Sequence, residues 1–134
     1  MIKNDVWFVL YVKDQSRSRD FYEKTLGVKP ALDVPGMCAF ELAPGVTLGL
    51  MPEKSIAKIL GDKTPDPAST NGAPRAELYL TVDDVDLHYR RAVAAGAKPV
   101  SGPEARGWGD IAAYAADPDS HIIAFARRND QPDS

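Results

Sequence analysis

Residues 26–30 read LGVKP, and residues 95–99 read AGAKP, 69 positions later in the chain. Two further pairs recur in the same order: VKD at 12–14 with VDD at 82–84, 70 positions apart, and PGVTL at 44–48 with the segment that ends in HII at 121–123, 75 positions apart. The spacings differ by only a few residues, as loop insertions would make them differ. The sequence therefore predicts an internal duplication.

Each half has the pattern of a strand, a helix and then three strands. In the first half, an apolar run starts at Val6, capping residues at 14–16 begin a helix, and Gly27 ends it. In the first half, the predicted strands are 6–12, 31–35, 37–42 and 46–51. In the second half, we expect a strand at 77–82, a helix at 84–95 closed by Gly96, an extended piece from residue 100, and strands at 110–115 and 121–126.

These elements predict an α+β fold in a single domain over residues 1–134. Module one spans about 5–51, a linker about 52–75, and module two about 76–128. Within the linker, 55–60 is expected to form a short helix with Ser55 as its cap. The Pro-, Gly- and Ser-rich stretch that follows is expected to be a crossing loop.

Composition narrows the possible partners. The chain has 134 residues, 44% of them hydrophobic, and a net charge of −3. Without clustered lysines and arginines, nucleic acid and anionic membrane are not expected as partners. The single cysteine, Cys38, excludes an intrachain disulfide, and the apolar run at the N-terminus is too short to span a membrane. With no export signal recognised, we expect a cytoplasmic protein.

Several segments resemble the vicinal oxygen chelate superfamily, which includes glyoxalase I, extradiol dioxygenases, and fosfomycin- and bleomycin-resistance proteins. They are VKD at 12–14, DFYEK at 20–24, LG at 26–27, VDD at 82–84, AGA at 95–97 and DPDS at 117–120. The resemblance covers the chain from about Val6 to Arg127. It implies paired βαβββ modules that form a cupped mixed sheet, and it implies a homodimer.

Enzymes of that superfamily chelate a divalent metal with four side chains, one from the first and one from the last strand of each module. Those positions fall here on Trp7, Gly49, Glu77 and Ala124. Only Glu77 offers a metal-binding donor, so no metal cofactor is expected. His88 and His121 have no paired spacing, and we expect a helix-surface and a turn-flanking histidine.

Strand alternation assigns the side chains to two faces. The cavity face would carry the aromatic residues Trp7, Tyr11 and Tyr79, with Gly49 and Ala124 leaving room beside them. The opposite face would pack under the helices through Phe8, Leu10, Val12, Leu48, Leu50, Leu78, Leu80, Val82, Ile123 and Phe125. Trp108, between two glycines, resembles tryptophan-bearing segments of bleomycin-resistance-like proteins, which implies ligand contact.

These features favour metal-independent binding of a small organic molecule by Trp7, Tyr11, Gly49, Tyr79, Trp108 and Ala124. The alternative is a glyoxalase-type lyase or another enzyme acting on a carbonyl-containing substrate, with Glu77 as base or with a metal site elsewhere. A third possibility is a dimerising subunit without a ligand. The rings can also simply fill the cup, and Glu77 can be an exposed residue at a strand end.

Overall fold

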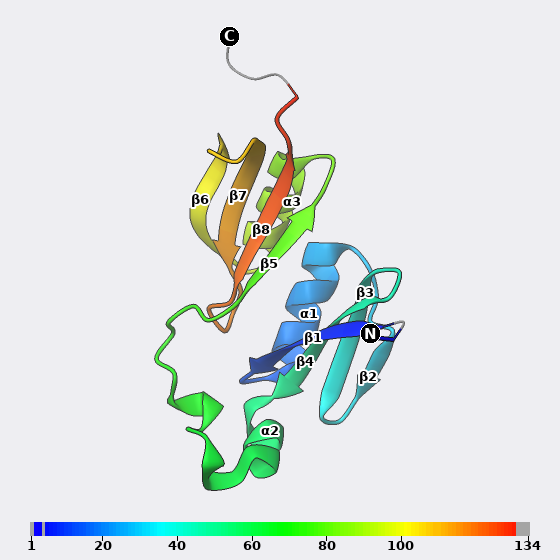
Figure 1. Cartoon of the computed structure of the whole chain (residues 1–134), viewed down its shortest axis with the longest axis vertical. Helices are drawn as coiled ribbons and strands as arrows, with labels where there is room; N and C mark the ends of the chain where they lie inside the picture. The colour runs from blue at the N-terminus through cyan, green and yellow to red at the C-terminus, as the bar shows by residue number, and fades with distance from the viewer. Residues whose placement is uncertain (1, 4, 131–134) are drawn as a thin grey trace. The chain divides into compact units, whose positions relative to one another are not determined.

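The computed structural model describes residues 2–3 and 5–130 (Figure 1). The chain divides into two compact units: the first runs to residue 73 without residues 24–26, and the second contains those three residues and the chain from Pro74 onward. Each unit holds one four-stranded sheet. None of the helices among the described residues is long and apolar enough to cross a membrane.

The sheet of the first unit has the strand order β1-β4-β3-β2, with β1 parallel to β4 and the other pairs antiparallel. Helix α1 connects β1 to β2. The bounds of these elements are β1 Val6–Val12, α1 Gln15–Leu26, β2 Leu32–Val34, β3 Met37–Ala43 and β4 Val46–Pro52.

The second unit repeats this topology. Its strand order is β5-β8-β7-β6, again with the first strand parallel to the last and with helix α3 after the first strand. Its elements are β5 Glu77–Thr81, α3 Val85–Ala94, β6 Lys98–Ala105, β7 Asp110–Ala116 and β8 Ile122–Arg128. The predicted α+β class and the two βαβββ modules are therefore confirmed.

The strand register supports the duplication residue by residue. Val9 on β1 pairs with Gly49 on β4, and Tyr79 on β5 pairs with Ala124 on β8. These pairs are related by the 70- and 75-residue spacings found in the sequence. The first strand and the last strand of the two modules are thus aligned in the same way.

An aspartate begins the helix of each module, and Asp14 belongs to the predicted capping stretch 14–16. The Asp14 carboxylate accepts a 3.0 Å hydrogen bond from the Arg17 amide, and the Asp84 carboxylate accepts one of 3.0 Å from the Leu87 amide. Gly27 ends α1 in the left-handed region, with φ 71°, where a side chain would be unfavourable.

The linker contains more helix than the sequence predicted. Helix α2 covers Glu53–Leu60, and it is followed by two short 3₁₀ turns, η1 Gly61–Lys63 and η2 Pro67–Ser69. Ser55 is not the cap, because the helix starts two residues earlier, directly after Pro52, without a side-chain cap. Ile56 is buried, so packing in the first unit stabilises this helix in place of a cap.

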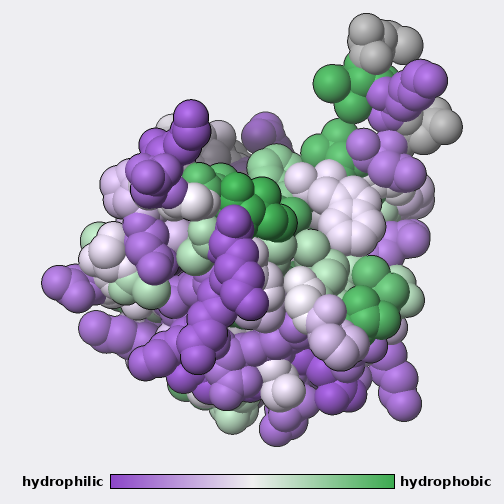
Figure 2. All heavy atoms as spheres, turned by 90° about the horizontal axis from the view of Figure 1, so that it is seen from below, coloured by the Kyte–Doolittle hydropathy of each residue, from purple (hydrophilic) through white to green (hydrophobic). Residues whose placement is uncertain are grey.

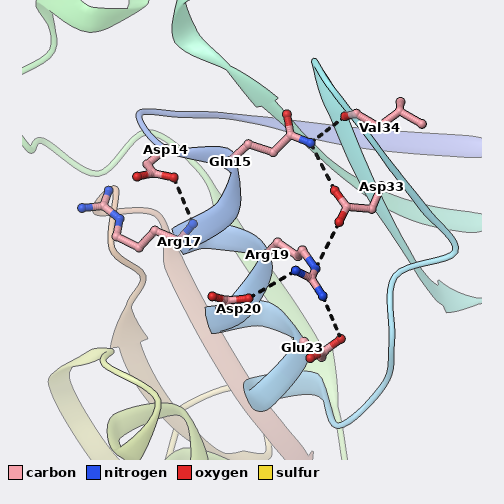
Figure 3. A network of polar contacts seen from close by, with 8 residues as sticks. All are labelled: Asp14, Gln15, Arg17, Arg19, Asp20, Glu23, Asp33 and Val34. Atoms are coloured by element: carbon pink, nitrogen blue, oxygen red, sulfur yellow. Dashed lines mark hydrogen bonds and ion pairs between the residues drawn. The ribbon is translucent and has the colours of Figure 1, made fainter.

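Helix α1 is tied to the β2–β3 hairpin by two side chains, Gln15 and Arg19 (Figure 3). The Gln15 amide donates a 2.7 Å hydrogen bond to the Val34 carbonyl, and its oxygen accepts one of 3.0 Å from the Gly36 amide. Arg19 Nε lies 3.2 Å from Asp33 Oδ2. These contacts fix the short edge strand β2 against the helix.

Most residues of the predicted helix-facing set are buried, as Leu10, Leu48 and Phe125 illustrate. Leu80 and Val82 are half-buried, and Phe8 is exposed, with 59% of it accessible. Along β1 only the second half of this face is covered, since Leu10 is 6% exposed and Val12 is fully buried. The prediction that Phe8 packs under a helix is therefore wrong. On the face drawn in Figure 2, apolar side chains also reach the surface between hydrophilic ones.

Candidate functional site

The sheet of the second unit has one face covered by α3. Phe125 points to that side, where its ring lies 5.9 Å from the His88 ring of the helix. Because side chains alternate along a strand, Glu77, Tyr79 and Ala124 lie on the opposite face. We call this the open face. It brings together the residues predicted for the site in module two.

On the open face, Tyr79 is held by two hydrogen bonds. Its hydroxyl donates to Asp110 Oδ2 at 2.6 Å and accepts from Trp108 Nε1 at 2.8 Å. The rings remain accessible, with 40% of Tyr79 and 55% of Trp108 exposed. The two aromatic residues predicted for this unit are thus one directly hydrogen-bonded pair, and the Asp110 carboxylate binds the Tyr79 member of it.

The Tyr79 side chain has to cross a strand to make these contacts. Tyr79 belongs to β5 and Asp110 to β7, and β8 lies between them. On this face β8 carries Ala124 and Ala126 between Ile122 and Arg128, and both alanines are fully buried. Because alanine side chains are small, they leave space above β8 for the Tyr79 ring to cross that strand. Ala124 therefore provides a floor for Tyr79, where the sequence had suggested free room.

The turn that carries Trp108 is closed by its own backbone. The Arg106 amide donates to the Asp110 carbonyl at 2.7 Å, and the Gly109 amide donates to the Arg106 carbonyl at 3.2 Å. Gly109 has φ +93°, and a Cβ there would lie 3.5 Å from the Arg128 guanidinium. Glycine therefore permits both the turn and the close approach of Arg128.

Arg106 anchors the same turn to the sheet. Its guanidinium donates hydrogen bonds of 2.9 Å to both the Ala112 carbonyl and Ser101 Oγ, and it lies 5.1 Å from the centre of the Tyr114 ring. Only 17% of its side chain is exposed. This arginine is occupied by the protein itself, and its role is to hold the base of the turn.

The pKa of Tyr79 is raised above its ordinary value of 10.0. Loss of hydration is the largest cause, and the hydrogen bond to Asp110 raises the pKa further, while the one from Trp108 lowers it. Tyr79 is therefore a neutral phenol at physiological pH. It offers a ring, but no tyrosinate base.

Glu77, the predicted catalytic residue, is exposed at the start of β5. Its carboxylate makes no hydrogen bond or ion pair within the part of the chain that the structure describes. It lies two residues before Tyr79 on the same face, a Cα separation of about 6–7 Å in a strand. A free carboxylate beside an aromatic ring can accept a proton or a hydrogen bond from a bound molecule.

The first unit carries the other predicted residues: Trp7 and Tyr11 on β1, and Gly49 on β4. Trp7 is 46% exposed. A Cβ at Gly49 would lie 3.2 Å from both Met37 Sδ and Val9 Cγ2, and 3.4 Å from Trp7 Cε3. The space that glycine opens is therefore filled by its neighbours, and Gly49 allows the indole to lie close to β4.

The four family metal positions can be tested against these surroundings. Trp7 and Gly49 pack together in the first unit, and Ala124 is part of an alanine floor in the second. Glu77 alone has an oxygen donor. Among the described residues, 2–3 and 5–130, no group of three His, Cys, Asp or Glu side chains could hold a metal ion. The residues present do not fit a chelated divalent metal.

Both histidines are engaged elsewhere. His121, buried after the DPDS turn, has Nδ1 3.1 Å from Asp117 Oδ2 and Nε2 3.2 Å from an Arg75 guanidinium nitrogen. His88 Nδ1 lies 2.9 Å from the Asp84 carbonyl oxygen. His121 flanks its turn as expected, but it is buried because its ring takes part in this polar network.

Sequence reasoning missed Asp110, although a signal was present. Asp110 begins the strand after the Gly-Trp-Gly turn and shares strand parity with Tyr114, which pairs with Ala124. That parity places its carboxylate on the open face. Its bond to Tyr79 joins strands that are not neighbours, so no local pattern could reveal it.

Comparison with known proteins agrees with this architecture. Residues 6–125 match the model of the Glyoxalase/Bleomycin resistance protein/Dioxygenase superfamily. An uncharacterized protein of Mycobacterium bovis is 32% identical over 115 residues, which are 84% of this chain and 75% of that protein.

Solved structures share the fold. A glyoxalase-related enzyme from Fulvimarina pelagi superposes with a TM-score of 0.78 at 23% identity, over 93% of this chain and 88% of that one. A glyoxalase/bleomycin resistance protein/dioxygenase from Nocardioides gives 0.77 at 22% identity, over 100% and 90%. The chain belongs to the Glyoxalase/Bleomycin resistance protein/Dioxygenase superfamily.

Proposed function

We propose that this protein binds a small, flat organic molecule without a metal, with the open face of the second unit as the main binding surface. The observation that carries the proposal is the pair of exposed rings, Tyr79 and Trp108, held together by a hydrogen bond of 2.8 Å. Aromatic side chains offer a large apolar surface at a low cost in conformational entropy, which suits stacking on a planar ligand.

Two further parts complete the proposed binding surface. Glu77 would accept a hydrogen bond from a ligand amine, and Ala124 would support Tyr79 from below. In the first unit, Trp7, Tyr11 and Gly49 would form a second surface, which we propose for the same kind of ligand. The protein is expected to act as a homodimer in the cytoplasm, which light scattering and cell fractionation test.

The test is a chemically broad panel of planar compounds, followed by thermal unfolding and tryptophan fluorescence. A binder should raise the Tm and quench tryptophan fluorescence. Trp108→Ala should lower the affinity for that binder about tenfold, because one stacked ring is lost. Trp7→Phe tests the first unit separately. Leu87→Ala is the matched control, because Leu87 is 39% exposed on α3, away from the open face. A panel without any Tm shift would contradict the proposal.

An enzymatic function is the second candidate, favoured by the unpaired carboxylate of Glu77. Glu77 would remove a proton from the carbon next to a substrate carbonyl. Exchange of that proton for deuterium in D₂O measures the step directly. Exchange that Glu77→Gln abolishes would establish the enzyme, whereas equal exchange in both proteins would reject Glu77 as the base.

Elemental analysis of protein purified without chelators tests the proposed absence of metal. We expect less than stoichiometric zinc, nickel, iron and manganese, and no change in Tm with EDTA. One bound metal per chain, removable with loss of Tm, would overturn this part of the proposal.

A further inference from the structure

Asp110 occupies the centre of the hydrogen-bonded group on the open face. Its side chain is only 16% exposed, and its Oδ1 lies 4.0 Å from Arg128 Nη1. Its other oxygen accepts the hydrogen bond that the Tyr79 hydroxyl donates. Asp110 sits on the regular strand β7, whereas Trp108 sits on the turn before it. A strand holds a side chain more firmly than a turn does.

The direction of the Tyr79 proton decides whether Trp108 has a partner. An ionised carboxylate can only accept, so it holds the phenol proton toward Asp110. The lone pairs of Tyr79 are then free to accept from the indole N–H, which can only donate. If the acceptor at 110 could also donate, the phenol proton could turn toward the indole, and that contact would be lost.

We propose that Asp110 is a positioning residue of the ligand site, which orients Trp108 through Tyr79. The relevance of this role to a ligand rests on the proposed function; the orientation itself does not. Because the Tyr79 hydroxyl already donates its hydrogen bond to Asp110 and accepts one from Trp108, it presents no donor to a ligand. The site then recognises a ligand on this face by the flat ring of the ligand, and Asp110 keeps the rings of Tyr79 and Trp108 ordered before the ligand binds.

Trp108 mobility gives a direct test without a ligand. The chain has two tryptophans, so Trp7→Phe leaves Trp108 as the only one. In that background, time-resolved fluorescence anisotropy compares Asp110→Asn, Tyr79→Phe and the double variant. Asp86→Asn is the matched control, because it removes a carboxylate that pairs with Arg90 on α3, with Arg90 Nε 2.8 Å from its Oδ2.

We expect faster local motion of the indole in Asp110→Asn and in Tyr79→Phe, and the double variant should equal Tyr79→Phe. Non-additivity of this kind identifies residues that act in series. Unchanged anisotropy in Asp110→Asn, or additive effects in the double variant, would overturn the proposal. Asp86→Asn should match its background.

Affinity supplies the second readout. For a binder that Trp108→Ala weakens, Asp110→Asn should raise the Kd about 2- to 10-fold, the cost of ordering one side chain on binding. An unchanged Kd would also reject the role of Asp110. A panel without binders rejects the proposed function instead, while the anisotropy result still decides whether Asp110 positions Trp108.

Discussion

The hydroxyl of Tyr79 and the carboxylate of Asp110 meet at 2.6 Å, although their strands β5 and β7 are separated by β8. This bond connects the edge strand of the second sheet to its interior across a floor of alanines. It also fixes the orientation of a ring that the sequence had identified only as an aromatic residue on one face of a strand.

Ala124→Leu tests the alanine floor. Ala124 is fully buried, so a larger side chain should displace Tyr79 and lower the free energy of unfolding by about 1–3 kcal/mol. Denaturant unfolding measures the loss. Thr81→Leu, at an exposed position on the same face, should change stability by less than about 0.5 kcal/mol. A stable Ala124→Leu protein would mean that free space exists above β8.

The alkaline titration of Tyr79 has a predictable sign. The difference in absorbance at high pH between the protein and Tyr79→Phe isolates this residue. Its pKa should fall in Asp110→Asn and rise in Trp108→Phe, because the first bond raises the pKa and the second lowers it. Since the folded pKa exceeds the unfolded one, the contribution to stability is complete below pH 10.0 and is lost as the pH rises through the folded value. Identical titrations in all three proteins would exclude the hydrogen bonds in solution.

Gly49→Ala tests the packing of the first unit. The new methyl would meet Met37 and Val9 at 3.2 Å, and we expect about 1 kcal/mol of destabilisation, moderated by the flexibility of methionine. In a Trp108→Phe background, the emission of Trp7 should also shift. Gly102→Ala is the control, because a Cβ there has no neighbour within 4 Å. Equal stability of the two variants would argue against this close packing.

Cys38 should be unreactive in the folded protein. Burial raises the pKa of its thiol from 9.0 to about 11, with Asp33 contributing. Alkylation at pH 8 should therefore be far slower in the folded than in the denatured chain. The same shift should make the free energy of unfolding fall between pH 9.0 and about 11. Rapid alkylation of the folded protein would contradict the burial.

The sequence by itself determined the duplicated βαβββ topology, the two ends of the first module's helix and the strand parity. These depend on local chemistry: Asp14 caps because its carboxylate reaches its own helix, and Gly27 ends that helix because it tolerates a positive φ. Parity follows from the alternation of side chains, and it predicts that Tyr79 and Ala124 share one face.

Only the tertiary structure decided what those positions do. The exposure of Phe8 depends on which parts of the chain cover the first half of β1. The space at Gly49 depends on where the side chains of Trp7, Met37 and Val9 lie. Asp110 joins Tyr79 through strand order and side-chain reach, which link residues 31 positions apart. Such contacts are properties of the packed sheet, so the residue that holds the aromatic pair in place could be recognised only there.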